Sequence, residues 1–587
     1  MQVFARQENV PHNWNDDNAA LLLEGSWSGR SRRARHDSLD ETIDARHAWI
    51  DGEAVRIAGL LAEGPDSAGF RHVCLPTGLL AHLGGLRLRY FLVKLLRWIA
   101  YCREVRRPIA SECWELHASQ GDDDFVELFV ELCKRHRVQG RVLQSGPEAV
   151  CATPASSSIH WRRRLANWLA GSAERATSDP SPSKRRRLLL CGDLDLLAPV
   201  ADAWQRSGGE AAGLCDEPII KLRLRQPQLR QLMCEGFRGC ENRFDTARPL
   251  DMFTVDDINL GRQLTRWLNA AHAACGPRWS RWLWAMDRHF TTWRPDALVL
   301  SEDATPFTRA AVWTAHRHGV PSIVAQHGAP CLQFGFAPLA ADWMAAWDEA
   351  SRAQFLDWGM PEEKVVITGS LPLNRSRMRL SGTSRPSHKT ARTVLILANL
   401  PARDDRPDGV AFHLTRDTHQ AMLRAALTAC ATAPGLRVIV KLHPRQQGTE
   451  PWPELLREFP DLPLQLVRRG RWTDYLSQSH AVVSCASSAG VEAARLGWPV
   501  VQLLPQGCAD ILPARRWGLV GSAVTADELR PLLRIALKTQ IKSRQNAFPS
   551  ECSAVALLAN FVERAIDVAH HTPLADIPSE ESLCLRT

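Results

Sequence analysis

The sequence predicts an α/β fold with two doubly wound, Rossmann-like domains and an N-terminal α/β extension. Short apolar segments of strand length alternate with amphipathic helical segments over residues 181–545. Two polar stretches, 177–183 and 376–389, divide this alternation into separate units. Alternating strands and helices are typical of parallel sheets covered by helices. The length of 587 residues allows roughly three or four domains of about 150 residues.

The composition is that of an ordinary soluble globular protein, with 45% apolar and 23% charged residues. The net charge of +8 is mild for this length, so it fits an anionic small ligand or membrane surface and does not require nucleic acid. No two of the 16 cysteines have the spacing of a zinc ribbon, so reduced, buried thiols in a cytoplasmic protein are expected. Residues 1–18 lack the apolar core of a signal peptide, and no apolar run predicts a spanning helix.

The first 180 residues divide into two regions. Residues 1–46 are polar and charge-rich, and partial disorder is expected there. Residues 47–180 are expected to form a small α/β region, whose role the sequence does not indicate. Within it, three acidic residues (122–124) precede apolar residues at helical spacing, which predicts an amphipathic helix. The apolar residues of this stripe are Phe125, Leu128, Phe129, Leu132 and Cys133. The next strand is expected at 138–143.

Two basic amphipathic segments, 87–107 and 161–169, allow a peripheral contact with the inner membrane at its cytoplasmic face. Their Arg and Lys residues alternate with Leu, Phe and Trp, as in helices that lie on anionic membranes. The alternative is an ordinary helix whose apolar face packs on the protein core. The sequence favours this alternative.

The first doubly wound unit is expected to span 181–375. Residues 187–193 are predicted as a strand that runs into a Gly turn, 194–207 as a helix and 211–214 as the next strand. Residues 237–292 are expected to be helical and rich in Trp. Three later strands, at 295–300, 321–325 and 365–368, end in polar or small residues. These endings are Ser301-Glu302-Asp303, Gln326-His327-Gly328 and Gly369-Ser370.

The second unit is expected to span 390–545, with a C-terminal helix and tail at 546–587. Its strand at 436–440 ends in Lys441-Leu442-His443-Pro444-Arg445. A later strand runs into the turn Ser487-Ser488-Ala489-Gly490, which opens a helix that stops at Gly497. Ligands of open α/β sheets bind at the carboxyl ends of the strands. His443 and the two serines are therefore expected on a ligand-binding edge.

Four motifs together resemble a known family. They are Gln326-His327-Gly328, the segment 365–372, Lys441 to Pro444, and Ser487-Ser488 with Glu492 and Gly497-Trp498-Pro499. In order and spacing the chain resembles the GT-B transferases of bacterial surface-polysaccharide synthesis. That group includes capsule and lipopolysaccharide glycosyltransferases and is similar to the CDP-glycerol glycerophosphotransferases of teichoic-acid synthesis. The resemblance covers about residues 187–540. It implies a nucleotide-activated donor on the second unit and a glycan or lipid-linked acceptor on the first.

The resemblance also implies which residues hold the donor. They are Lys441, His443, Arg445, Ser487, Ser488, Gly490 and Glu492, with Gly369 and Ser370 from the first unit. In the related families the histidine of the His-Pro pair contacts donor phosphate. If the strand continues to His443, the Lys441 side chain would point to the same face of the sheet as His443. The helix after Ser487 would turn free N–H groups toward an anion, and Glu492 in its first turn would accept from ribose hydroxyls. The alternatives are a serine helix cap without a ligand and a histidine bonded within a turn.

The reaction also needs a base for the acceptor hydroxyl. His327 is the first candidate, because the unperturbed imidazole pKa lies near neutrality and the equivalent His-Gly histidine of the glycerophosphotransferases is thought to be catalytic. Glu302 and Asp303 are the competing candidates. Sialyltransferases of this fold use an acidic motif that ends in Gly, whereas Ala304 follows the acids here. No acidic cluster of the DxD kind stands in a donor-like position, so neither a metal nor a cofactor is expected.

The expected function is transfer of a sugar from a nucleotide-activated donor to a surface polysaccharide or lipid-linked glycan. Polyol-phosphate transfer from a CDP-activated donor is an alternative that the sequence barely separates from it. A non-hydrolysing sugar-nucleotide epimerase would need acidic and Arg residues that 503–514 do not clearly supply. A non-catalytic sugar-nucleotide-binding protein also remains possible, although it would need neither His327 nor His443.

Overall fold

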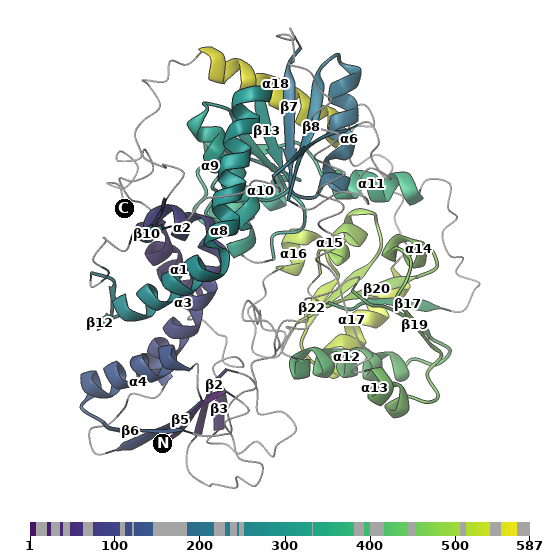
Figure 1. The fold of residues 1–587 in the computed structure, drawn as a ribbon. Helices are drawn as coiled ribbons and strands as arrows, with labels where there is room; N and C mark the ends of the chain where they lie inside the picture. Colours follow the sequence, from purple (N-terminus) through teal and green to yellow (C-terminus); the bar gives the residue numbers. More distant parts are fainter. Residues whose placement is uncertain are drawn as a thin grey trace, which may run out of the picture.

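Three sheets of parallel strands form the framework of the described chain (Figure 1). The computed structural model describes residues 1–6, 20–24, 36–38, 47–62, 74–105, 108, 112–119, 122–144, 185–216, 229–234, 243–245, 250, 252–331, 333–380, 392–399, 416–443, 452–485, 487–504, 512–539 and 553–571. The three sheets contain five, seven and six strands and follow one another along the chain. The expected fold class, an α/β chain with two doubly wound units of the GT-B kind and an N-terminal α/β extension, is confirmed.

The first doubly wound unit is built on the seven-stranded sheet, in the order β16-β15-β14-β13-β7-β8-β9. Its strands are β7 (Arg187–Cys191), β8 (Glu210–Cys215), β9 (Arg230–Met233), β13 (Ala297–Leu300), β14 (Ser322–Ala325), β15 (Trp343–Ala346) and β16 (Val365–Ile367). Its helices include α6 (Leu194–Arg206), α8 (Gly261–Trp293), α9 (Pro306–Arg317) and α10 (Glu349–Asp357). The chain builds one side from β7 and then crosses to β13, so the strand order reverses between these two strands. Such a switch point is where open α/β sheets bind ligands.

The second unit repeats this plan on six strands, in the order β19-β18-β17-β20-β21-β22. Its strands are β17 (Thr393–Leu397), β18 (Arg437–Lys441), β19 (Leu464–Val467), β20 (Ala481–Ser484), β21 (Val500–Leu503) and β22 (Gly521–Ala523). Its helices are α12 (Arg416–Ala431), α13 (Trp452–Glu458), α14 (Trp472–Leu476), α15 (Ser488–Arg495), α16 (Ala514–Trp517) and α17 (Ala526–Lys538). The strand order reverses between β17 and β20.

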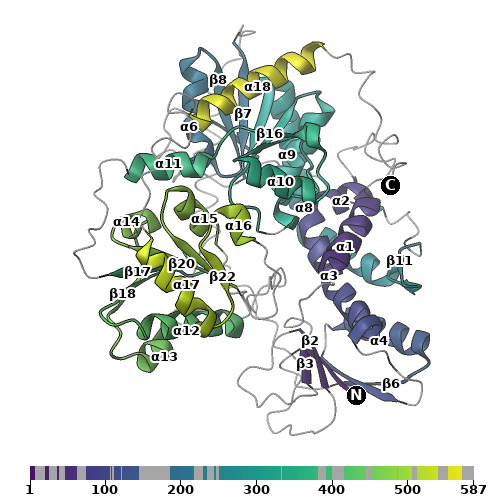
Figure 2. The same cartoon turned by 180° about the vertical axis from the view of Figure 1, so that it is seen from behind.

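The last described helix, α18 (Ala554–His571), returns to the first unit (Figure 2). Its apolar stripe, including Leu558 and Val562, is buried in one cluster with Leu188 of β7 and Val299 of β13. The helix therefore belongs to the core of the first unit, although 546–587 was expected to stand apart. The sequence shows the apolar stripe but does not show which sheet receives it.

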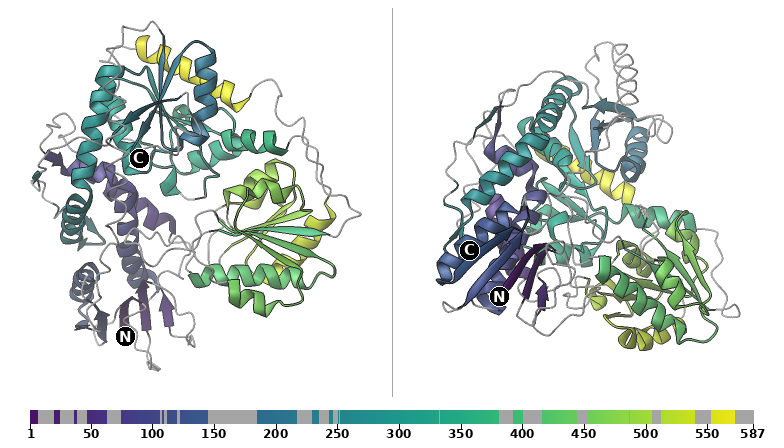
Figure 3. Two further views of the ribbon diagram at one scale, coloured as in Figure 1. Left: turned by 45° about the vertical axis from the view of Figure 1, so that its right-hand side comes forward. Right: turned by 60° about the horizontal axis from the view of Figure 1, so that its bottom comes forward.

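Helix α11 (Leu371–Leu380) joins the two units, and it lies between them in Figure 3. It contacts α6 and α18 on one side and α14 and α15 on the other. Leu373 is buried in the core of the second unit. The expected boundary at 375, with a linker from 376, is therefore wrong, because the helix continues to Leu380. The polar residues from 376 onward concealed the helix.

The N-terminal sheet has the order β3-β2-β1-β5-β6. Its strands are β1 (Gln2–Arg6), β2 (Ala20–Glu24), β3 (His36–Ser38), β5 (Cys113–Ala118) and β6 (Gln139–Gln144). Three of these strands lie within 1–46, where partial disorder was expected, and apart from Met1 the rest of that segment lies outside the described residues. β1 is the central strand, and Val3, Phe4 and Ala5 are fully buried. Polar residues dominate the average composition of the segment and obscure these short apolar strands.

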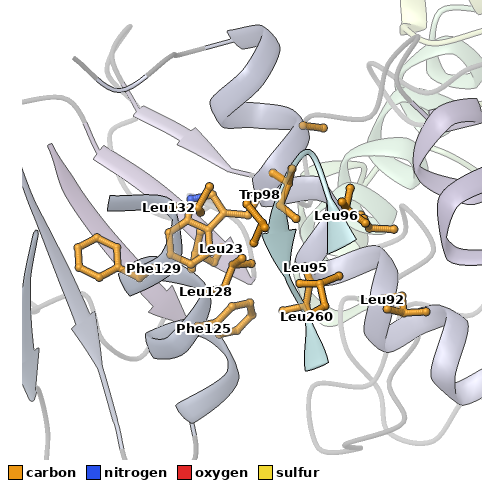
Figure 4. Close-up of a cluster of buried hydrophobic side chains, with 14 of the residues drawn as sticks. Leu23, Leu92, Leu95, Leu96, Trp98, Phe125, Leu128, Phe129, Leu132 and Leu260 are labelled. Atoms are coloured by element: carbon orange, nitrogen blue, oxygen red, sulfur yellow. The ribbon is translucent and has the colours of Figure 1, made fainter. Parts of the chain in front are cut away.

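Helices α1 (His47–Ala62), α2 (Thr77–Leu83), α3 (Gly85–Ala100) and α4 (Asp123–His136) complete the N-terminal extension. The predicted amphipathic helix is confirmed as α4, whose apolar stripe is buried. Figure 4 shows Trp98 of α3 between α4 and the sheet, and its ring stacks on Phe129 with centroids 6.1 Å apart. Leu92, Leu95 and Leu96 are buried in the same core. The apolar face of α3 therefore packs on protein, which is the alternative that the sequence favoured over a membrane contact.

Two further differences concern the first third of the chain. The helix expected over 237–292 begins only at Gly261, because β11 (Thr254–Val255) and β12 (Ile258–Asn259) form a hairpin before it. Asp256 and Asp257 form its turn with positive φ angles of 48° and 61°, a conformation that Asp tolerates. The basic segment 161–169 lies outside the described residues. No helix in the described ranges is long and apolar enough to cross a membrane.

Candidate active site

The candidate site lies where the carboxyl edges of the two large sheets approach each other. On the first sheet, Asp193 follows β7 and Ser301 follows β13, on either side of the switch point. The Asp193 amide donates to Ser301 Oγ over 2.7 Å, and the Asp193 carboxylate caps α6 through the amide of Leu196 at 3.2 Å. Asp193 thus caps α6 in the turn that follows β7. His327 follows β14, the neighbour of β13.

The orientation of the His327 imidazole is fixed at its edge and on one face. Nδ1 lies 3.0 Å from the carbonyl oxygen of Ser301. Because a carbonyl only accepts, Nδ1 carries the proton and Nε2 keeps its lone pair in the neutral ring. The ring stacks on Phe336, with centroids 4.9 Å apart and planes inclined by 8°. The residue nevertheless stays exposed to solvent.

The electrostatic surroundings favour the neutral form of His327. Desolvation by the surrounding protein lowers the pKa of the imidazole, and the Glu302 carboxylate and the Ser301 carbonyl only partly oppose this. Although the ring is reached by solvent from one side, the many protein atoms around it displace water from the others. At neutral pH the ring is therefore a neutral base with Nε2 unprotonated.

Gln326 holds the turn that carries His327. Its side-chain oxygen accepts from the amide of Trp347, and its Nε2 donates to the carbonyl of Gly328 and to Ser351 Oγ, over 2.8, 2.8 and 3.1 Å. The Trp347 indole N–H donates to the Gln326 carbonyl over 2.8 Å. Because water cannot reach these buried groups, each hydrogen bond satisfies a polar group that would otherwise lack a partner. The turn is thereby joined to the end of β15 and to α10.

The second unit touches this turn at Gly328. The amide of Ala329 donates to Ser488 Oγ over 3.1 Å, and a Cβ placed on Gly328 would lie 2.9 Å from that oxygen. Two ion pairs flank the contact: Arg495 with Asp348 at 2.7 Å, and Arg516 with Asp357 at 2.7 Å. A Cβ at position 328 would push the Ser488 hydroxyl away from the Ala329 amide, so glycine preserves this contact. The start of α15 is thus placed beside the His327 turn.

The two acidic candidates for the base are engaged elsewhere. The Glu302 carboxylate accepts from the amides of Ala304 and Thr305 over 2.6 and 2.9 Å and from two threonine hydroxyls, so it holds the turn that leads into α9. Asp303 is buried and accepts from the amides of Ala340 and Ala341 over 2.5 and 3.1 Å. Burial raises the pKa of Asp303, while Arg309 opposes that shift. These contacts leave His327 as the better-placed base.

On the second unit, His443 and Ser487 come near the same sheet edge, since β18 and β20 both pair with β17. Ser487 caps α15 by accepting from the Ala489 amide over 3.4 Å, and its hydroxyl proton remains available for another acceptor. His443 is half-buried two residues beyond the end of β18. Pro444 and Arg445 lie outside the described residues.

Other residues expected to hold the donor engage their own surroundings. β18 ends at Lys441, so the strand does not continue to His443 as the shared-side argument required. The Lys441 ammonium donates to the carbonyls of Leu442 and Arg468 over 2.8 and 3.2 Å, and desolvation lowers its pKa. Gly490 lets α15 pack on β20, because a Cβ there would lie 2.2 Å from Ser484 Oγ. Each residue thus has a structural role.

Glu492 is also placed differently from the expectation. It is the fifth residue of α15, so it lies beyond the first turn. Its carboxyl accepts from the Ser376 hydroxyl of α11 over 3.2 Å and is buried, and desolvation raises its pKa to about 7. The side chain therefore faces the joining helix. Gly369 has φ of +88°, and Ser370 accepts from the Leu373 amide over 3.1 Å, so this pair begins α11.

Phe336 and Ser301 are the two site residues that sequence reasoning missed. Ser301 was noted only as the residue before two acids, and its backbone oxygen has no signature in the sequence. Phe336 lies between two strands in a segment without periodicity. In retrospect, the single signal is an aromatic residue shortly after the His-Gly pair. Among the described residues, no three His, Cys, Asp or Glu side chains gather as a metal site would require.

Comparison with known proteins adds little beyond the fold. No family model matches the chain, and no curated protein sequence matches it significantly. Among solved structures, similarity extends to the UDP-GlcNAc 2-epimerase of Methanocaldococcus jannaschii, at 11% identity and a TM-score of 0.40, over 66% of this chain and 100% of that one. A glycosyltransferase of Rickettsia africae shows 8% identity and a TM-score of 0.36, over 66% and 94% of the two chains.

A wall teichoic acid polymerase is a third such structure, with 9% identity and a TM-score of 0.31, over 71% of this chain and 100% of that one. Similarity at this level does not distinguish an epimerase from a transferase. The reaction is therefore inferred from the residues of the site.

Proposed function

We propose that the chain is a glycosyltransferase that moves a sugar from a nucleotide-activated donor to a hydroxyl of a glycan or lipid-linked glycan. The observation that carries the proposal is the His327 imidazole, whose Nδ1 is bound to the Ser301 carbonyl and whose Nε2 is left as an acceptor. A neutral histidine held in one tautomer at a sheet switch point is suited to removing a proton from a hydroxyl.

In the proposed reaction the acceptor hydroxyl donates its proton to His327 Nε2 as its oxygen attacks the anomeric carbon of the donor sugar. The new carbon–oxygen bond forms while the bond from that carbon to the donor phosphate breaks. The nucleotide leaves with the electron pair of the broken bond. The imidazolium is stabilised by the Ser301 carbonyl and by the nearby carboxylate of Glu302, both of which favour the charged ring.

The donor phosphates are proposed to lie at the start of α15, beside His443 and Ser487. The Ser487 hydroxyl accepts from the Ala489 amide and keeps its proton for a phosphate oxygen. The N-terminal end of a helix favours negative charge. The contact between Ala329 and Ser488 places this end next to the histidine of the first unit. Transfer requires that short separation, because both substrates must meet.

The test compares His327→Ala with His318→Ala. His318 lies in the same unit at the end of α9, where it bonds Asp287 over 2.9 Å and packs on Phe290. A thermal-shift panel of CMP-, CDP-, UDP- and GDP-sugars first identifies the donor, because a ligand that binds the folded state raises the melting temperature. Nucleotide release is then measured with a bacterial glycolipid extract as acceptor.

We expect His327→Ala to reduce nucleotide release by a factor of about 100 or more while donor binding persists, and His318→Ala to leave both unchanged. Wild-type turnover in His327→Ala would overturn the proposed base. If the protein forms an epimer of the donor sugar in the absence of acceptor, its reaction is epimerisation and the proposed transfer is wrong. Absence of binding by every sugar nucleotide would favour a non-catalytic protein.

A further inference from the structure

A loop of the first unit covers one face of the His327 ring. It begins with the short helix η4 (Gln333–Gly335) and runs to Ala341. Phe336 is the residue of this loop that stacks on His327, and it is buried against Phe355 and Trp358 as well. The position of the loop therefore decides how much water reaches that face of the imidazole.

The N-terminal extension holds this loop through Arg89. Arg89 lies on α3 and is 2% exposed, although α3 otherwise packs on the apolar core. Its Nη1 donates to the carbonyl of Ala337 over 2.7 Å, and its Nε donates to the Gly85 carbonyl within the helix over 3.2 Å. Ala337 directly follows Phe336. A charged donor from the extension thus holds the residue next to the aromatic ring.

The far end of the loop is held by the first unit. Asp303 accepts from the amides of Ala340 and Ala341. Its charge is balanced by Arg309 of α9, which also donates to the His82 carbonyl at the end of α2 over 3.2 Å. A Cβ on Gly85 would lie 3.0 Å from the Arg309 guanidinium, so α3 begins directly against this cation. The extension and the first unit therefore clamp the loop from both ends.

We propose that the N-terminal extension is part of the transferase machinery, and that Arg89 is a positioning residue that keeps Phe336 stacked on His327. The proposal rests on the proposed function for its effect on transfer. It assigns α3 a role beyond packing on the apolar core. Arg89 acts through the Ala337 carbonyl and touches neither substrate nor His327.

The consequence is a defined environment for the base. Asp193, Glu302 and Asp303 are the carboxylates that face His327 from the ends of β7 and β13. Phe336 brings no charge from the loop, and the start of α15 brings serine hydroxyls. When the loop loosens, water reaches the ring face, desolvation falls and the imidazole binds protons more readily. The ring also loses a constraint on the direction of Nε2.

The test measures the His327 titration by NMR of histidine-labelled full-length protein, together with transfer. In Arg89→Met we expect the His327 midpoint to rise toward about 6.5 and kcat to fall about tenfold or more, with the donor KM unchanged. Arg89→Lys keeps a charged donor and is expected to recover most of both. The matched control is Arg266→Met, because Arg266 of α8 joins the extension through Asp124 at 3.1 Å without touching the loop.

An Arg89→Met protein that is folded and keeps both the wild-type His327 midpoint and kcat overturns the proposal. If Arg89→Met does not fold, Phe336→Leu decides, since it keeps an apolar side chain but removes the stacked ring. Its His327 midpoint must then rise, and an unchanged midpoint overturns the proposal. Failure of the proposed function is distinguishable, because His327→Ala would then retain transfer while the titration in Arg89→Met still reports the position of the loop.

Discussion

The two sheet edges that form the candidate site differ in what their residues are bonded to. On the first unit, Gln326 holds the turn that carries His327, and Ser301 and Phe336 orient its ring and leave Nε2 as an acceptor. On the second unit, the Lys441 ammonium donates to the neighbouring Leu442 carbonyl, and the Glu492 carboxyl accepts from Ser376 of the joining helix α11. The difference indicates that the reacting group is preorganised on the first unit, and that the second unit contributes mainly the start of α15.

Among the changes that test this comparison of the two edges, Gly328→Ala is expected to have the largest effect, because the edges meet at Gly328. Gly328→Ala places a Cβ 2.9 Å from Ser488 Oγ, so the hydroxyl must turn away from the Ala329 amide or the turn must shift. We expect kcat to fall by about 10- to 100-fold, because displacements well under 1 Å already disturb reacting geometry. Ser488→Ala removes the clashing oxygen, so the double variant is expected to recover much of the loss. Equal activity of Gly328→Ala and wild type would show that the edges need not approach so closely.

The next prediction concerns stability and tests how the first edge supports the His327 turn. Gln326→Leu leaves the buried Trp347 amide without its acceptor, so we expect the free energy of unfolding to fall by about 2–3 kcal/mol. Denaturant unfolding measures this change. Gln420→Leu is the control, because Gln420 donates to Glu454 at the surface and its loss should cost under about 0.5 kcal/mol. Equal losses in the two variants would remove Gln326 as the support of the turn.

The second edge is tested through Glu492. Its folded pKa of about 7 lies above the ordinary value of 4.5, so the folded state binds more protons between these two values. Stability is therefore full below about pH 4.5 and declines as the pH rises toward 7, by on the order of 2 kcal/mol. Glu492→Gln carries no titrating proton and should lack this decline. Unfolding at pH 5 and pH 8 measures it, and a wild-type protein equally stable at both values would refute the burial of a neutral carboxyl.

The smallest effect concerns the cap of α15. Ser487→Ala is expected to cost about 0.5–1 kcal/mol of stability and to weaken donor binding about fivefold, because the same hydroxyl caps α15 and is proposed to bind the donor phosphate. Thr525→Ala removes the equivalent cap of α17, where Thr525 accepts from the Glu528 amide over 3.3 Å. It should cost similar stability without affecting the donor. Equal donor affinity in both variants would leave Ser487 as a cap alone.

Much of the architecture could be predicted because strands and helices carry local patterns. The strand endings at His327 and Ser487 were visible, since apolar runs stop there at small or polar residues. The long-range contacts could not be predicted from these local patterns. That α18 packs on β7, that Arg89 reaches Ala337, and that Glu492 faces Ser376 depend on which elements meet in space. The three strands within 1–46 were missed because each is short and lies among polar residues.

The central claim is that His327 acts as the base in its neutral form. The most direct measurement is the pH dependence of kcat/KM for transfer, made beside the NMR titration of His327 in the same protein. Because its folded pKa lies below the ordinary value of 6.5, activity should fall only below that pH, with a midpoint that coincides with the His327 titration. Transfer that continues undiminished at a pH where His327 is fully protonated would contradict the claim.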